Sequence, residues 1–219
     1  RSFVDLCGLL RFQLRWSHVH RIPKTSVLGH TLIVAMISYL MSLEAGACER
    51  RCFNNYFTGL FHDLPEALTR DIISPVKHSI EGLSALIKSY EREEMQEKVY
   101  PLVPEGWHQE LRLFTEDEFR NVVWRDDTMV CCEGDDISRR YNHDTYNPRD
   151  GELIKAVDDL AAFMEAQLAI SNGINSPELL QASKSIRERY AGMHIAGIDI
   201  GKLYAELQEN TARSPVGPA

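Results

Sequence analysis

Few features of an exported protein are present in this chain. Its five cysteines, Cys7, Cys48, Cys52, Cys131 and Cys132, are an odd number and include no C-x-x-C pair. This pattern provides no disulfide framework and favours neither a metal site nor a redox site at the cysteines. No charged segment followed by a short apolar run is found at the start of the sequence, so we expect no secretory signal. We expect reduced thiols and a cytoplasmic location.

Positive charge is also scarce. The 219 residues include 24 Lys and Arg against 32 Asp and Glu, which gives a formal net charge of −8 at pH 7. A nucleic-acid polymer requires a basic protein face, so we expect no such partner. A small anionic substrate is compatible with this charge, because a few local Arg or Lys side chains can bind one phosphate group.

The sequence shows no strand-like alternation, internal repeat or low-complexity tract. Apolar residues instead recur at three-to-four-residue spacing, which is typical of amphipathic helices. The hydrophobic share of 44% is sufficient for a core. We therefore predict an all-α bundle, with residues 1–219 forming a single domain. The expected helices are Ser2–Trp16, a helix capped by Thr25 or Ser26 that ends near Ala45, Glu49–His62, Pro65–Leu68, Ser79–Tyr100, Thr115–Val130, residues 152–170, Ser176–Tyr190 and Ile198–Asn210.

One segment raises the question of a membrane span. The run VLGHTLIVAMISYLMSL, from Val27 to Leu43, is nearly all apolar but contains His30. It is slightly short for a membrane span. Amphipathic helices elsewhere in the chain can cover it, so we expect a buried core helix and no membrane partner.

A polar segment, CCEGDDISRRYNHDTYNPRDG, separates two helical regions. Its order of acidic residues does not match the register of a calcium-binding loop. Helical periodicity resumes immediately after it. We therefore predict a polar surface insertion over about 131–150, and a loose tail over about 211–219.

The residues best suited to chemistry are a histidine in the apolar run, His62-Asp63 at the end of the next helix, and Asp158 in a later one. Imidazole and carboxylate together suit a divalent transition metal. Asp158 lies beside the apolar stripe of its helix, whereas Asp159 is expected further round. Taken singly, His30 can be an ordinary core histidine and the His-Asp pair can be accidental. The combination of His30, His62, Asp63 and Asp158 is much more specific, and we predict these four as metal ligands.

Through these four residues the sequence resembles the HD-domain metal-dependent phosphohydrolases. It is most similar to the bacterial 5′-deoxynucleotidases of the YfbR type, over much of residues 8–80 and again near 152–170. The string E-x-L-T-x-D-x-x-[ST]-P-V-K after the His-Asp pair is more discriminating than the pair itself. The matching residues are Arg15-Trp16, His30, His62-Asp63, Glu66, Leu68-Thr69, Asp71, Pro75-Val76-Lys77 and Asp158.

The resemblance implies a helical HD-domain bundle with one divalent metal ion, which can be Mn, Co, Fe, Ni, Zn or Mg. It implies hydrolysis of a phosphate monoester, typically a deoxynucleoside 5′-monophosphate, by an enzyme that is often a homodimer. By the same likeness, Glu66 acts on the attacking water and is catalytic together with Asp63. The resemblance further implies substrate binding by Arg15 and Lys77 near the phosphate, and by Trp16 and Asp71 at the sugar.

Three departures from the family pattern concern the substrate. Gly29 precedes His30 where the family usually has Glu, Arg70 occupies a position where Gly is common, and the insertion over 131–150 is additional. The sequence therefore leaves open an HD hydrolase of another phosphate, such as a deoxynucleoside triphosphate, guanosine tetraphosphate or a cyclic dinucleotide. It also leaves open a nucleotide-binding module without turnover. The absence of a GYP motif beside the His-Asp pair favours the monoester.

Overall fold

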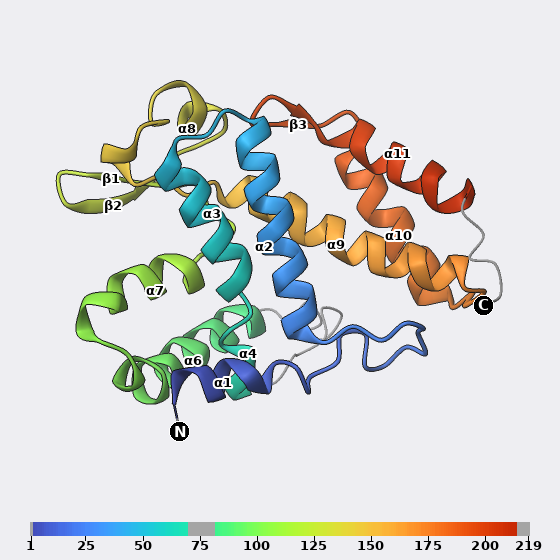
Figure 1. The fold of residues 1–219 in the computed structure, drawn as a ribbon, viewed down its shortest axis with the longest axis horizontal. Coiled ribbons are helices and arrows are strands. Elements are labelled where there is room, and N and C mark those ends of the chain that lie inside the picture. The colour runs from blue at the N-terminus through green and yellow to red at the C-terminus, as the bar shows by residue number, and fades with distance from the viewer. Residues whose placement is uncertain (1, 70–81, 214–219) are drawn as a thin grey trace.

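The computed structural model describes residues 2–69 and 82–213, and the chain is mainly helical (Figure 1). The helices are α1 (Phe3–Leu9), α2 (Val27–Glu44), α3 (Glu49–Phe61), α4 (Glu66–Thr69), α6 (Leu83–Lys98), α7 (His108–Thr115), α8 (Asp136–Arg139), α9 (Gly151–Ser171), α10 (Pro177–Tyr190) and α11 (Ile200–Arg213). Short 3₁₀ turns cover Tyr100–Leu102, Glu105–Trp107 and Asp144–Tyr146. The predicted mainly helical architecture is confirmed.

The centre of the fold is the pair α2 and α3, which lie side by side (Figure 1). The N-terminus of α2 is fixed by Ser26, whose side chain accepts a hydrogen bond from the Gly29 N–H at 3.1 Å, as expected for an N-cap. At Gly59 of α3, a Cβ atom would lie 2.9 Å from the Cα of Ala35. A residue without a side chain therefore allows the close approach of the two helices.

Helix α9 crosses the α2–α3 pair, and α10 and α11 pack against it (Figure 1). The main core cluster lies between these helices. It includes Val34 and Met41 from α2, Phe163 from α9 and Tyr204 from α11. A second cluster joins α1, α4, α6 and α7. The start of α2, the end of α3 and an inner turn of α9 meet between the two clusters, where the candidate site lies.

The prediction of a helix over Thr115–Val130 is wrong, and so is the prediction that the chain has no strands. Helix α7 ends at Thr115, and β1 (Val122–Arg125) pairs with β2 (Thr128–Cys131) as an antiparallel hairpin. The connecting residues Asp126 and Asp127 have φ values of 49° and 58°. This left-handed pair is the backbone of a two-residue hairpin turn, and the β-branched valines of β1 fit a strand. A second short hairpin joins β3 (His194–Ile195) and β4 (Ile198–Asp199).

Several expected boundaries also change. The first helix ends at Leu9 instead of continuing to Trp16, and the chain then runs through turns to α2. Strand β4 takes the first two residues of the expected helix Ile198–Asn210. The start of the expected helix Ser79–Tyr100 lies outside the described residues, which resume one residue before α6. Helix α10 begins as predicted, with the Ser176 side chain accepting from the Leu179 N–H.

The segment 131–150, expected as a surface insertion, is tied into the fold at its end. Arg149 and Asp150 are buried. Asp150 forms an ion pair with buried Arg51 of α3, and the Asn54 side chain donates to the carbonyl of Pro148 at 2.9 Å. This segment therefore connects α3 to the start of α9.

Arg149 organises the turn that follows α7. Its fully buried guanidinium donates hydrogen bonds to the carbonyls of Leu113, Glu116, Asp117 and Arg120. Replacement by Met removes all of these donors, and a buried polar group without a partner costs roughly 1–3 kcal/mol. We expect Arg149→Met to lower the free energy of unfolding by at least about 3 kcal/mol, measured by urea denaturation.

The matched control for this substitution is Arg139→Met. The Arg139 side chain is 75% exposed and pairs with Asp135, the residue that precedes α8, so its removal should change stability by less than about 0.5 kcal/mol. Equal urea midpoints for the two variants would contradict the assigned role of Arg149.

Among the described residues, α2 is the one helix whose length and apolar composition would allow it to cross a membrane. Its buried share is 44%. The expected burial of this helix therefore holds for only part of its surface. One side of α2 faces the interior, while an outward stripe is exposed. The stripe is formed by Leu32, Met36, Leu40 and Leu43.

Candidate metal centre

His30 and His62 reach the same point from neighbouring helices. His30 lies in the first turns of α2 and is fully buried, and His62 is the residue at which α3 ends. Their ring centroids are 5.9 Å apart. Nδ1 of His62 lies 2.9 Å from the carbonyl oxygen of Gly59, so donation of an Nδ1 proton to that oxygen directs Nε2 toward the site.

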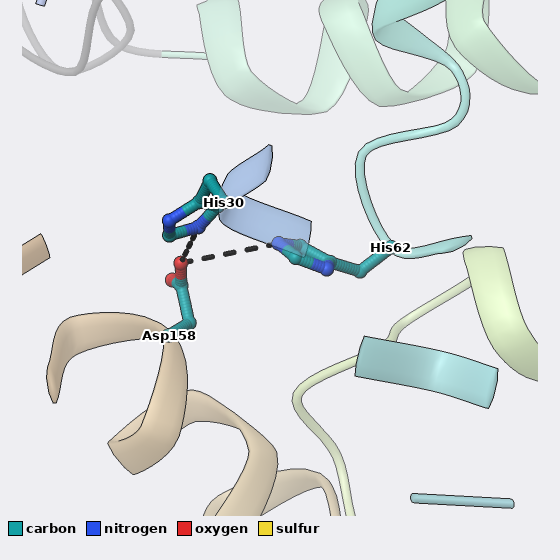
Figure 2. A group of neighbouring side chains, drawn as sticks. All are labelled: His30, His62 and Asp158. Carbon is teal, nitrogen blue, oxygen red and sulfur yellow. Dashed lines mark hydrogen bonds and ion pairs between the residues drawn. The ribbon is translucent and has the colours of Figure 1, made fainter. Parts of the chain in front are cut away.

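Asp158 completes a group of three potential ligands (Figure 2). Helix α9 carries its carboxylate to both histidines. The Oδ1 atom lies 3.0 Å from Nε2 of His30 and 3.9 Å from Nε2 of His62. The ligand atoms of these three residues all lie within 4.8 Å of one another. Two imidazoles and a carboxylate at this separation can hold one divalent ion.

Asp63, the fourth predicted ligand, lies beside this group but outside it. Its Oδ2 is 3.3 Å from Nε2 of His62 and 3.8 Å from the Arg15 guanidinium. The Asp63 carboxylate therefore lies between a candidate metal ligand and a cationic side chain. In this position it can serve the metal and also orient Arg15.

The electrostatics of the site favour positive charge between the carboxylates. Burial alone would lower the pKa of His62, but the charges of Asp63 and Asp158 offset it and raise that pKa to about 9. Burial would raise the pKa of Asp158, yet Lys155, His30 and His62 hold it well below its usual range. The pKa of Asp63 is likewise lowered, against burial, by His62 and Arg15. The carboxylates are thus ionised, as metal ligands must be.

The buried donor atoms fit a divalent ion. Within the described part of the chain, the buried atoms Nε2 of His62 and Oδ2 of Asp63 lie 3.3 Å apart, but neither forms a well-aligned hydrogen bond with the other or with a third group. Buried polar atoms without a partner are costly and uncommon in proteins. Coordination to a cation would satisfy both of them, and nitrogen and oxygen donors are those that Mn, Fe, Co, Ni and Zn accept.

A polar cavity of about 120 Å³ opens beside this group. It is lined by His62, Asp63 and Glu66, by α6 and by the turn after α7. Glu66 begins α4 and is 7% exposed. Its backbone carbonyl accepts a hydrogen bond from the Gln13 side chain at 2.8 Å, which anchors the backbone at this position. Glu66 therefore shares a small cavity with the His-Asp pair, as a water-activating residue must.

The predicted substrate-binding residues are only partly described. Arg15 and Trp16 lie at the site, because both contact Glu165 of α9: Arg15 Nε at 3.4 Å and Trp16 Nε1 at 2.7 Å. The Arg15 side chain is 20% exposed, so it can still meet a ligand. Asp71 and Lys77 fall outside the described residues.

Sequence reasoning missed two charged residues of α9. Glu165 is buried, contacts His30 at Nδ1, and follows Asp158 by seven residues, which is two helical turns on the same face. An acid at this spacing in an otherwise apolar stretch is the signal that could have identified it. Lys155 donates to both Asp158 and Asp159, at 2.9 and 2.8 Å.

The expected difference between Asp158 and Asp159 is also revised. Asp159, expected further from the core, is 7% exposed and accepts hydrogen bonds from Tyr190 and Arg189 of α10, each at 2.8 Å. Both acids are therefore enclosed, on different sides of α9. Asp159 joins two helices, whereas Asp158 faces the histidines.

Comparison with known proteins is consistent with this arrangement. The sequence profile of the HD domain family matches residues 7–187. No curated protein matches the chain in sequence. A solved HD-domain phosphohydrolase from Listeria innocua has a TM-score of 0.69 at 16% identity, over 97% of this chain and 89% of that one. The HD phosphohydrolase DatZ of cyanophage S-2L, solved with dA and one catalytic Zn²⁺ ion, has a TM-score of 0.57 at 14% identity, over 96% of each chain.

Proposed function

Because this chain belongs to the HD domain family, we propose that it is a metal-dependent phosphomonoesterase that hydrolyses (deoxy)nucleoside 5′-monophosphates to nucleoside and phosphate. The observation that carries the proposal is the convergence of His30, His62 and Asp158 beside the cavity that contains Glu66. DatZ, which shares the fold, was solved with a deoxynucleoside. The similarity to YfbR-type 5′-deoxynucleotidases supports the same substrate class.

In this proposal His30, His62, Asp63 and Asp158 hold one divalent ion. When bound, such an ion supplies a coordinated water of lowered pKa and positive charge beside the phosphoryl oxygens. Its identity among Mn, Co, Fe, Ni, Zn and Mg is part of the test described below.

The residues of the chain would perform the remaining steps. Arg15 binds the phosphoryl oxygens with its planar guanidinium, which leaves phosphorus open to in-line attack. Glu66 orients the water and accepts its proton while the new P–O bond forms and the bond from phosphorus to the 5′ oxygen breaks. The departing 5′ oxygen takes up the proton that Glu66 removed from the water, so the products are nucleoside and inorganic phosphate. Trp16, Asp71 and Lys77 are proposed to contact the sugar and the phosphate.

The charges around the cavity favour a monophosphate over a polyphosphate. Its two basic lining residues on α6 already face acids. Lys88 lies 3.5 Å from Glu118, and Arg92 lies 3.5 Å from Asp117. A triphosphate or tetraphosphate would need additional unpaired cations at this rim. A single phosphate needs little more than the ion and Arg15.

The test is a phosphate-release assay on a panel of nucleotides, with Mn²⁺, Co²⁺, Mg²⁺, Zn²⁺ or EDTA. We expect one phosphate per deoxynucleoside 5′-monophosphate, lost with EDTA and restored by metal. Release of pyrophosphate or triphosphate would show a different HD hydrolase. Tight nucleotide binding without release would show a binding module and overturn the proposed turnover.

We also propose that the active form is a homodimer in the cytoplasm, where the five free thiols would stay reduced. The exposed stripe of α2 supports the dimer, because Leu32, Met36 and Leu40 repeat every four residues along one face. A twofold-related copy would bury the same stripe on both partners. Figure 1 shows α2 crossing one face of the molecule.

Light scattering after size exclusion should give twice the chain mass of 25.0 kDa. Leu40→Glu places a charge at the centre of the stripe and should convert the dimer to a monomer. The matched control is Leu86→Glu, since Leu86 is 65% exposed on α6 and lies outside the stripe. A monomeric native chain, or a dimeric Leu40→Glu variant, would contradict this assignment.

A further inference from the structure

One buried carboxylate, that of Glu165, contacts three residues of the candidate site. Its Oε1 lies 3.2 Å from Nδ1 of His30. Its Oε2 accepts a hydrogen bond from the indole N–H of Trp16 at 2.7 Å and one from Nε of Arg15 at 3.4 Å. The residue is 6% exposed. A single side chain of α9 therefore connects a candidate metal ligand with two candidate substrate-binding residues.

The contact to His30 selects a tautomer. A carboxylate can only accept, so Nδ1 of His30 must carry the proton that Glu165 receives as a hydrogen bond. Nε2 of His30 faces a second carboxylate, with Oδ1 of Asp158 at 3.0 Å. A divalent ion bound at Nε2 would replace any proton there, and the single proton that the ring then keeps is the one at Nδ1, which Glu165 accepts. Buried carboxylates that hold metal-bound histidines in this way orient the ring and increase its basicity.

The second contact of Glu165 is with Trp16, a residue of unusual backbone conformation. Trp16 has φ of +57°, a conformation that bulky residues rarely adopt and that costs on the order of 1–3 kcal/mol. The indole packs against a small cluster with Ala166, Ala169 and Leu179, and its N–H is bound by Glu165. The surroundings thus fix both the ring and the chain at this position.

Glu165 accepts a hydrogen bond from Nε of Arg15, so it does not occupy the terminal NH groups of the guanidinium, which can bind a phosphate. One of these groups, NH1, lies 3.8 Å from Oδ2 of Asp63. Burial alone would raise the pKa of Glu165, but His30 and Arg15 lower it to about 2. The carboxylate is therefore charged when it holds these groups. The neighbouring Arg21 donates to the backbone carbonyl of Glu165, at 3.2 Å, and does not depend on the side chain.

We infer that Glu165 is a positioning residue of the site, which holds His30 in its metal-binding tautomer and fixes Arg15 and Trp16 for the substrate. The inference rests on the proposed function, because it assigns Glu165 to the same reaction. A glutamine at this position cannot accept hydrogen bonds from His30, Trp16 and Arg15 together, because only one of its two terminal atoms is an acceptor. If its oxygen accepts from Trp16, its NH₂ faces Nδ1 of His30 and favours the wrong tautomer; if it is flipped, two N–H groups oppose each other at Trp16.

The first experiment compares Glu165→Gln with Glu152→Gln, an exposed acid on the same helix. Loss of a residue that orients a ligand typically weakens metal binding about 10–100-fold, so we expect this decrease for Mn²⁺ affinity, measured by electron paramagnetic resonance. At saturating Mn²⁺, KM for a deoxynucleoside monophosphate should rise about tenfold, equivalent to ~1.4 kcal/mol, while kcat changes less. Glu152→Gln should match the native protein in both.

The second experiment requires no variant and covers the case in which Glu165→Gln does not fold. Nitrogen-15 NMR of the native chain with Zn²⁺ should show His30 protonated at Nδ1 and unprotonated at Nε2. The opposite tautomer would overturn the inference. So would a folded Glu165→Gln with native Mn²⁺ affinity and native KM. Metal affinity and tautomer are measured without nucleotide, so they can support the inference even if the chain releases no phosphate.

Discussion

Replacing Asp63 with Asn is expected to reduce phosphate release by at least roughly 10³-fold and to weaken Mn²⁺ binding strongly, because the metal contribution to such a reaction is worth several kcal/mol. Asn keeps the shape of the side chain but removes its charge. Asp63 lies 3.3 Å from His62 and 3.8 Å from Arg15, and its side chain is 16% exposed. The substitution therefore acts on the candidate ligand set and on the phosphate-binding arginine together.

Mn²⁺ binding by electron paramagnetic resonance and turnover in the phosphate assay measure the two effects separately. The matched control is Asp127→Asn, in the exposed turn of the β1–β2 hairpin, where Asn tolerates the φ of 58°. Circular dichroism verifies that both variants fold. If Asp63→Asn binds Mn²⁺ and turns over like the native chain, Asp63 is neither a ligand nor a catalytic residue.

Replacing Glu66 with Gln is expected to separate metal binding from catalysis. A positioned acid–base group contributes roughly 10²–10⁴-fold in rate, so we expect a loss of kcat of that size. Glu66 lies outside the three-residue ligand group and lines the adjoining cavity. Mn²⁺ affinity should therefore stay within about threefold of native. Gln retains the volume of Glu, so any rate loss reports the lost proton acceptor.

The control for Glu66→Gln is Glu97→Gln, on the exposed side of α6, which should change neither kcat nor Mn²⁺ affinity. Near-native turnover of Glu66→Gln would show that the base assignment is wrong. Loss of Mn²⁺ together with turnover would instead make Glu66 part of the metal site.

Local signals predicted much of the fold and the core of the candidate site. Ser26 and Ser176 cap the helices that follow them, because short polar side chains satisfy the first free N–H groups of a helix. Residues as distant in sequence as His30 and Asp158 were predicted to meet, and their ligand atoms lie 3.0 Å apart. Polar groups facing a core need a shared partner, and this requirement could be inferred from the sequence.

The remaining features depend on tertiary contacts. The hairpin after α7 was predicted as a helix because its strands have only four residues, and its turn depends on two aspartates with positive φ. Glu165 was missed, and the burial of Asp159 was not expected, because both look like ordinary helix acids until α2 and α10 pack against α9. Their partners, His30 and Tyr190, are 135 and 31 residues away in the sequence.

The most direct test of the account is the anomalous scattering of manganese in crystals of the native chain. We predict one Mn²⁺ ion coordinated by Nε2 of His30, Nε2 of His62 and the carboxylates of Asp63 and Asp158. An ion bound elsewhere, or these four side chains with no ion between them at saturating Mn²⁺, would contradict the metal centre and with it the proposed hydrolase.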